Sequence, residues 1–103
     1  MELIQNELLE TIPKLYETER SLNPICHIKL FTPDSQWSWY IIEIDENQDV
    51  CYGYVQGLEC ELGYFSLEEE LKQIKGPLGL PIERDISFTP TALSIIRNSS
   101  VKS

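Results

Sequence analysis

The chain has 103 residues, a length that favours one domain, and its 17 acidic and 8 basic residues give a net charge of −9. This charge disfavours direct binding to nucleic acid or to an anionic membrane surface. The three cysteines form no C-x-x-C pair, so we expect reduced thiols, no zinc site and no cofactor. Neither a signal peptide nor a membrane-spanning run is recognisable, and we expect a cytoplasmic protein.

The first two thirds of the chain predict one short helix and four strands. Apolar residues at helical spacing predict an amphipathic helix over residues 3–12, which Pro13 ends. Alternating or β-branched stretches predict strands at residues 26–31, 37–45, 50–56 and 60–65. Short turn sequences separate these strands, and strands joined in this way pair as an antiparallel meander.

The remaining residues predict two further helices. Ser66 and Glu69 have the spacing of a capping box, and Gly76 with Pro77 ends the helix that begins there. A last helix begins around Pro90. We therefore predict an α+β fold in which a meander of about four strands packs against two or three α-helices in two layers. This domain spans residues 1–97, and residues 98–103 form a flexible polar tail.

Aromatic residues of the second strand indicate a candidate binding site. Strict alternation places Tyr40, Ile42 and Ile44 on one face, and Trp37, Trp39, Ile41, Glu43 and Asp45 on the other. If the next strand brings Tyr52 and Tyr54 beside the tryptophans, the sheet carries an aromatic patch with an acidic rim of Glu43, Glu59 and Glu61. Such a patch marks an interaction site when it is exposed. The alternative is that a helix or loop covers it as a second core.

Charged residues offer a second candidate site. Arg84 follows a stiff, proline-containing loop and could bind an anionic ligand group, although an ion-pair brace made with its acidic neighbours is the commoner arrangement. The carboxylates of Glu43, Glu59 and Glu61 could join Arg84 in a ligand, metal or catalytic site. No histidine or calcium-loop motif accompanies them, so no catalytic residue is assigned.

Three segments together resemble a bacterial single-domain family of unknown function. They are FTPDSQWSWY at residues 31–40, GYVQGLECELGYFSL at residues 53–67 and GPLGLPIERD at residues 76–85. The resemblance implies accessory genes of mobile genetic elements, among which inhibitors of host restriction or CRISPR defences are frequent. It brings no catalytic role with it.

We therefore expect a small acidic, non-enzymatic domain that binds a protein partner, with anti-defence activity as its role. The alternative is a small enzyme or a ligand-binding or metal-binding domain that uses the carboxylates with Arg84.

Overall fold

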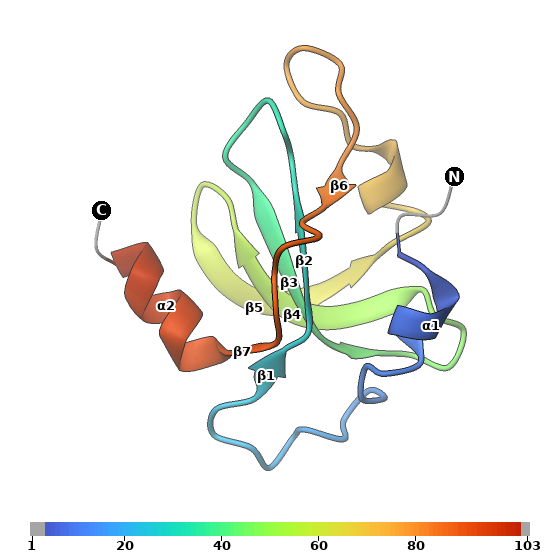
Figure 1. The fold of residues 1–103 in the computed structure, drawn as a ribbon, viewed down its shortest axis with the longest axis vertical. Coiled ribbons are helices and arrows are strands. Elements are labelled where there is room, and N and C mark those ends of the chain that lie inside the picture. Colours follow the sequence, from blue (N-terminus) through green and yellow to red (C-terminus); the bar gives the residue numbers. More distant parts are fainter. Residues whose placement is uncertain (1–3, 102–103) are drawn as a thin grey trace.

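The computed structural model of the chain describes residues 4–101. In chain order its elements are α1 (Asn6–Leu9), β1 (Ile25–Cys26), β2 (Ile28–Phe31), β3 (Ser38–Ile44), β4 (Val50–Gln56), β5 (Cys60–Ser66), the 3₁₀ helix η1 (Leu71–Gln73), β6 (Glu83–Arg84), β7 (Thr91–Ala92) and α2 (Leu93–Val101) (Figure 1). Strands dominate, and short helices lie at either side of the sheet, so the fold is α+β as predicted.

Five strands form an antiparallel sheet in the order β5-β4-β3-β2-β6. The strands β2 to β5 follow one another both in the chain and in the sheet, which confirms the antiparallel meander. The short β6 adds a fifth strand beside β2, where Leu30 pairs with Arg84. A separate ladder joins β1 to β7, with Ile25 opposite Ala92. The sheet therefore has more strands than the sequence predicts, because the last part of the chain returns to pair with the first.

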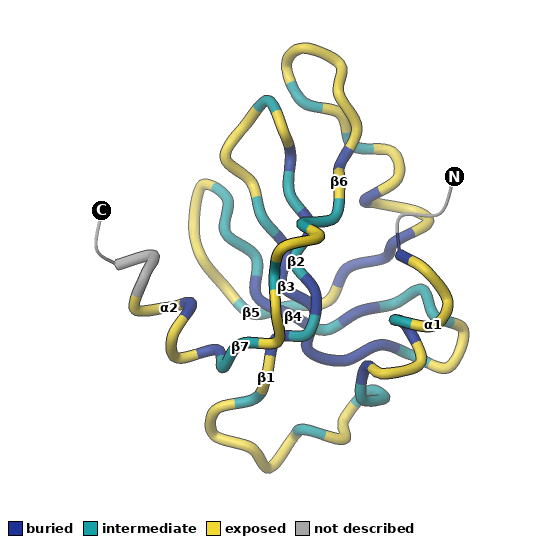
Figure 2. Tube along the Cα trace, viewed as in Figure 1, coloured by how far each residue is buried: buried dark blue, intermediate teal, exposed yellow. Residues whose placement is uncertain are grey.

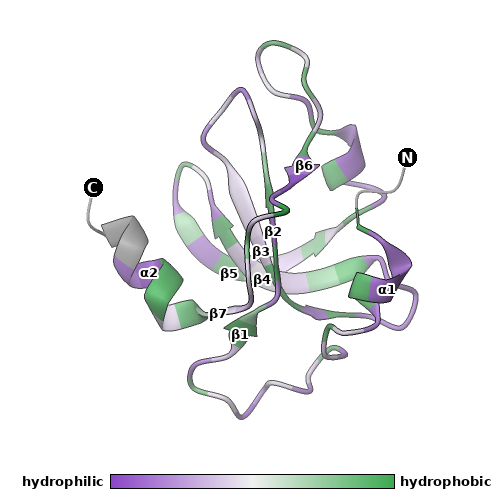
Figure 3. Ribbon diagram, viewed as in Figure 1, coloured by the Kyte–Doolittle hydropathy of each residue, from purple (hydrophilic) through white to green (hydrophobic). Residues whose placement is uncertain are grey.

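Apolar residues cover both faces of the sheet. One face carries Leu9 of α1, Ile28, Leu30, Trp39, Ile41, Ile44, Cys51, Phe65 and Leu71 of η1. The other face carries Cys26, Tyr40, Ile42, Tyr54, and Leu93 and Ile96 of α2. Buried residues accordingly run along the central strands (Figure 2), and the first turns of α2 are apolar (Figure 3). The predicted two-layer arrangement, with helices on one face, is wrong, because alternate residues of β3 are apolar on both sides.

A β-bulge in β3 changes which side chains share a face. The pairing of β3 with β4 skips Ile42, so that Glu43 lies opposite Tyr52. An extra residue of this kind reverses the alternation of the side chains beyond it. Ile44 therefore packs in the same cluster as Trp39, whereas strict alternation predicts it on the opposite face. Glu43 moves the other way and lies on the face of Tyr52.

The two α-helices differ in extent from the predicted ones. α1 covers only part of the predicted helix 3–12, because the N–H of Thr11 already bonds three residues back, as in a turn. α2 runs to Val101, so the predicted flexible tail 98–103 is helical up to residue 101, and its last two residues lie outside the described range. Within residues 4–101, no helix has the length and apolar character to cross a membrane.

The predicted helix after Ser66 is replaced by turns and η1. The hydroxyl of Ser66 accepts a hydrogen bond from the N–H of Glu69 at 3.0 Å, as a capping residue would. The carboxylate of Asp49, in the β3–β4 loop, accepts a hydrogen bond from the N–H of Glu68 at 2.8 Å. This bond holds the turn that follows Ser66 against the β3–β4 loop. The hydrogen bond with Asp49 favours a turn at this position over the helix that the local sequence pattern predicts.

Candidate functional site

The four aromatic residues of the predicted patch lie on two faces of the sheet. Trp37 and Trp39 stack with ring centroids 5.9 Å apart, and Trp39 is buried. Tyr52 and Tyr54 lie on the opposite face, because Tyr54 pairs with Tyr40 and not with a tryptophan. The structure therefore does not bring the four together, and Trp39 belongs to a core.

The carboxylates and the arginine of the second candidate site are also apart. Glu43 lies in the central strand β3, Glu61 in β5 at one edge of the sheet, and Arg84 in β6 at the other edge. Glu59 is exposed in the β4–β5 turn. In the part of the chain that the structure describes, no three His, Cys, Asp or Glu side chains are grouped to hold a metal ion. The predicted cluster of carboxylates with Arg84 is therefore not assembled.

Asp85, the neighbour of Arg84, braces β6 against β2. Its carboxylate lies 3.9 Å from Nζ of Lys29 and accepts hydrogen bonds from the hydroxyl and the N–H of Ser87. The hydrogen bond from the Ser87 hydroxyl is the main reason that the pKa of Asp85 lies below its ordinary value. The backbone N–H of Asp85 also donates to the carbonyl of Lys29. The ion pair of this segment thus joins Asp85 to Lys29, whereas the alternative interpretation was a brace between Arg84 and its acidic neighbours.

Two contacts join three loops at one end of the sheet. The indole of Trp37 lies so close over Gly57 that a Cβ atom there would stand 2.3 Å from the ring. The carboxylate of Asp34 lies against Gly76 and accepts a hydrogen bond from the N–H of Leu78 at 2.7 Å. The β2–β3 loop thereby contacts both the β4–β5 turn and the loop before β6, and all three lie in the upper half of Figure 1.

The tips of these loops expose apolar side chains. Leu58 is 93% exposed, Leu78 is 79% exposed and Trp37 is 39% exposed, and Leu80 is exposed as well. We refer to Trp37, Leu58, Leu78 and Leu80 as the three-loop surface. Figure 2 shows the loops that carry them as mostly exposed segments, in yellow. Of the predicted site residues, Trp37 is the one that belongs to this surface.

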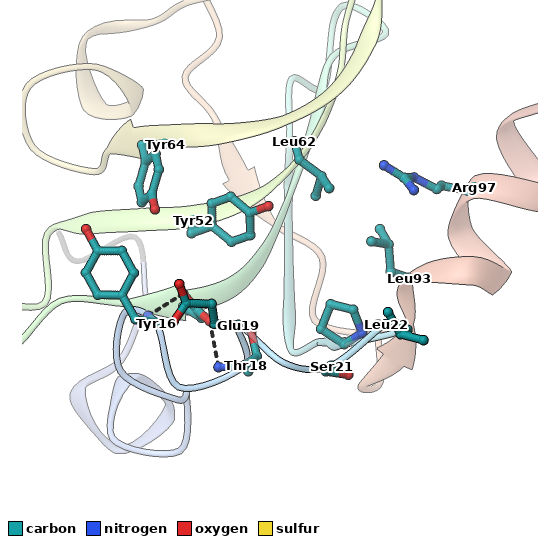
Figure 4. A pocket seen from close by; sticks show the side chains of 12 residues that line it. Tyr16, Thr18, Glu19, Ser21, Leu22, Tyr52, Leu62, Tyr64, Leu93 and Arg97 are labelled. Carbon is teal, nitrogen blue, oxygen red and sulfur yellow. Dashed lines mark hydrogen bonds between the residues drawn. The ribbon is translucent and has the colours of Figure 1, made fainter.

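A second candidate site is a cavity of about 310 Å³ at the other end of the sheet (Figure 4). Strand residues of β3, β4 and β5 form one side, the loop between α1 and β1 forms another, and α2 closes a third. We refer to this cavity as the tyrosine pocket, and its main lining residues are Tyr16, Glu43, Tyr52, Leu62, Tyr64 and Arg97. Glu43 and Tyr52 are the predicted site residues that meet here.

The buried carboxylate of Glu43 shapes this pocket. Glu43 is 3% exposed and accepts hydrogen bonds from the N–H groups of Tyr16 and Thr18, each at 2.8 Å, and from the Thr18 hydroxyl. These bonds hold Tyr16 at a φ of 72°, in the left-handed region that a tyrosine rarely adopts. Glu43 is thus an anchor for the loop that carries Tyr16, and not a solvent-exposed rim residue.

Several residues of both sites were not predicted from the sequence. The role of Asp34 could have been predicted, since an aspartate in a proline turn often accepts hydrogen bonds from backbone N–H groups. The glycine-containing loop at residues 76–80 has such groups to donate. Tyr16 and Arg97 could not have been predicted in this way, because the loop after α1 and the helix α2 meet only in the folded chain. Tyr64 lies beside Tyr52, with ring centroids 5.1 Å apart, through a strand register that the sequence leaves open.

The fold, the three-loop surface and the tyrosine pocket define a small α+β domain with two candidate sites. Residues 3–98 match the model of a family described as protein of unknown function (DUF2958), and the chain belongs to this family. The predicted membership in a domain family of unknown function is thereby confirmed. The comparisons with curated proteins and with solved structures gave no significant match.

Proposed function

We propose that the protein is a non-enzymatic interaction domain whose three-loop surface binds another protein. The observation that supports this proposal is the joint exposure of Trp37, Leu58 and Leu78 on three loops that specific contacts hold together. Exposed apolar side chains gathered at one end of a molecule are typical of interaction surfaces. Tryptophan is also among the residues that most often dominate the binding energy of an interface.

Contacts within the fold position the loops that carry these residues. The ring of Trp37 is held between the buried Trp39, on which it stacks, and the backbone of Gly57. The carboxylate of Asp34 holds the backbone around Leu78. A surface that is already in place loses less conformational entropy on binding, so its contacts contribute more to affinity.

Acidic residues flank the three-loop surface. Glu59 follows Leu58 directly, and both Glu59 and Glu61 are exposed, as is Glu83 of β6. Lys75 is the basic residue of these loops. Together with the net charge of −9, this arrangement suits a partner that has an apolar patch with a basic rim. Such a charge also accelerates association in a salt-dependent way, and it disfavours nucleic acid as the direct ligand.

We further propose that the partner is a cytoplasmic enzyme of host defence, of the restriction or CRISPR type, and that the protein is an accessory product of a mobile element. The acidic surface supports this role, because enzymes that act on nucleic acid expose basic clefts. The resemblance of the three sequence segments supports the same context.

The test is affinity capture of the tagged protein from a nuclease-treated bacterial lysate, followed by calorimetry with the purified partner. The double variant Trp37→Ala, Leu78→Ser should raise the dissociation constant at least about 100-fold. Leu58→Ser, which changes a side chain with almost no contact to the fold, should also weaken binding. Ile86→Ser is the matched control, since Ile86 is 82% exposed outside the three-loop surface, and it should bind normally.

Each variant is checked for its melting temperature, so that loss of binding is separated from loss of the fold. Binding that is unchanged in the folded Leu58→Ser and double variants would exclude the three-loop surface. Affinity that does not fall with added salt would exclude the charge-complementary partner.

A further inference from the structure

The tyrosine pocket has the size and the lining of a binding site for a small chemical group. Its volume of about 310 Å³ lies at the lower end of the range for ligand pockets. It lies at the end of the sheet opposite to the three-loop surface, so it is independent of the proposed function. Figure 4 shows the rings of Tyr16, Tyr52 and Tyr64 grouped on one side of the cavity. The buried carboxylate of Glu43 lines the same cavity.

The placement of Tyr16 at the pocket requires an unfavourable backbone conformation. Tyr16 is 63% exposed and Tyr64 is 55% exposed, so neither ring is placed there by burial in the core. Tyr16 is nevertheless kept in the left-handed backbone region by its hydrogen bond to Glu43. Unfavourable backbone geometry that the surroundings enforce tends to occur at functional positions.

The charge of the pocket favours a cation. Glu43 places a carboxylate next to the rings, and the groups that donate hydrogen bonds to it are neutral N–H and O–H groups. A second carboxylate, that of Glu19, also lines the cavity. The face of an aromatic ring attracts a cation, and this attraction strengthens where water is partly excluded. Rings and carboxylates together therefore select an ammonium or guanidinium group.

The same face of the sheet already binds one guanidinium group. The guanidinium of Arg97 lies 5.4 Å from the ring centroid of Tyr54. Figure 4 shows Arg97 on the side of the pocket away from Tyr16 and Tyr64. Arg97 therefore limits the occupant to one positive charge, placed among the three tyrosines, with an apolar stem directed along Leu62.

We propose that the tyrosine pocket binds a single alkylammonium or alkylguanidinium group, held by the rings of Tyr16, Tyr52 and Tyr64 and by the charge of Glu43. The group belongs either to a small amine or to a lysine or arginine side chain of a partner protein. Both sources present the same cationic head on an aliphatic stem, and the experiment separates them.

The experiment is an NMR titration of the full-length protein, with labelled aromatic rings, at constant ionic strength. Butylguanidinium chloride and an acetylated, amidated Ala-Arg-Ala peptide are the two probes, and sodium butyrate is the anionic control. Saturable shifts should appear at Tyr16, Tyr52 and Tyr64, while the indole signals of Trp37 stay unchanged. Saturation by butylguanidinium alone identifies a small organic cation as the occupant, and saturation by the peptide alone identifies a partner side chain.

Variants test the assignment of the site. Tyr64→Ala should weaken binding about tenfold, and Glu19→Gln should weaken it by a smaller factor. Both side chains are exposed, so the fold should survive these changes, whereas Ile95→Ala on the outer side of α2 should bind as the natural chain does. No saturable shift with either probe, equal binding of butyrate, or unchanged affinity in Tyr64→Ala would overturn the proposal.

Discussion

The carboxylate of Asp34 and the backbone N–H of Leu78 form a hydrogen bond of 2.7 Å across 44 positions of the sequence. The same carboxylate oxygen lies 3.5 Å from the N–H of Leu80. Its other oxygen is buried and, among the residues that the structure describes, has no hydrogen-bond partner. One side chain of the β2–β3 loop therefore sets the position of the loop before β6, and with it two of the four residues of the three-loop surface.

Replacing Asp34 by alanine should release that loop. We expect the free energy of unfolding to fall by about 1–2 kcal/mol, because a charge-assisted hydrogen bond is lost. Hydrogen exchange at the amide of Leu78 should accelerate, and urea denaturation measures the change in stability. Asp34→Asn keeps one acceptor oxygen and should have a smaller effect. Unchanged exchange at Leu78 in Asp34→Ala would contradict this role.

Adding one methyl group at Gly57 should displace Trp37. A Cβ atom at this position would lie 2.3 Å from the indole ring, and the half-exposed ring can move away more easily than the backbone. We expect the tryptophan emission of Gly57→Ala to shift to longer wavelength, because Trp37 becomes more exposed to water. Gly63→Ala is the matched control, since a Cβ atom there meets nothing within 4 Å. Equal spectra for the two variants would show that Trp37 does not rest on Gly57.

Neutralising Glu43 should loosen the loop that carries Tyr16. In Glu43→Gln an amide N–H₂ replaces one of two oxygens that both accept hydrogen bonds, so at least one backbone donor loses its partner. We expect a loss of about 3 kcal/mol in the free energy of unfolding, measured in urea. Glu61→Gln changes an exposed strand carboxylate and should remain within about 0.5 kcal/mol of the natural chain. Comparable losses in both variants would contradict the anchoring role of Glu43.

The three cysteines should differ in reactivity. Cys60 is exposed, whereas Cys26 and Cys51 are buried. Burial raises the pKa of Cys26 to about 12 and also raises the pKa of Cys51, so neither forms the reactive thiolate near neutral pH. Iodoacetamide should therefore modify Cys60 alone in the folded protein and all three cysteines in urea, as mass spectrometry would show. Modification of Cys26 before unfolding would mean that this core opens locally.

The raised pKa of Cys26 also predicts a pH dependence of stability. In the unfolded chain this thiol ionises near its ordinary value of 9.0, whereas in the folded protein it stays protonated up to about 12. The unfolded state therefore binds fewer protons over this range, and the free energy of unfolding falls as the pH rises from about 9 towards 12. Urea denaturation at about pH 8 and pH 10 should show a smaller decrease in Cys26→Ala than in the natural chain. Equal decreases would exclude Cys26 as a cause.

The meander could be predicted because its signals are local. The strands around Tyr40 and Tyr54 contain the aromatic and β-branched residues typical of sheets, and turn residues separate them. The faces of β3 could not be predicted beyond Ile42, since no residue there marks the bulge that reverses the alternation. This one irregularity moved Glu43 from the expected rim of an aromatic patch to the base of the tyrosine pocket.

The two sites were harder to predict because each one depends on contacts between distant segments. Trp37 was a predicted binding residue and lies on the three-loop surface, but the rest of that surface comes from two other loops. Gly57 brings the first of them against Trp37, and Asp34 holds the second. The prediction of a helix after Ser66 was wrong for a similar reason, since hydrogen bonds to Asp49, which lies in another loop, hold this segment in a turn. Local propensity reflects each segment in isolation. In the folded chain, the contacts between two distant segments decide the conformation of both.

The ladder between β1 and β7 has a consequence for the order of folding. Asn23 and Ser94, which flank this ladder, exchange two hydrogen bonds across 71 positions of the sequence, at 2.9 and 2.8 Å. The meander needs only short loops to close, while this ladder closes a loop that contains the whole meander. The meander should therefore form first, and α2 should dock last. During synthesis on the ribosome the tyrosine pocket then lacks one wall until the segment that includes Arg97 has emerged.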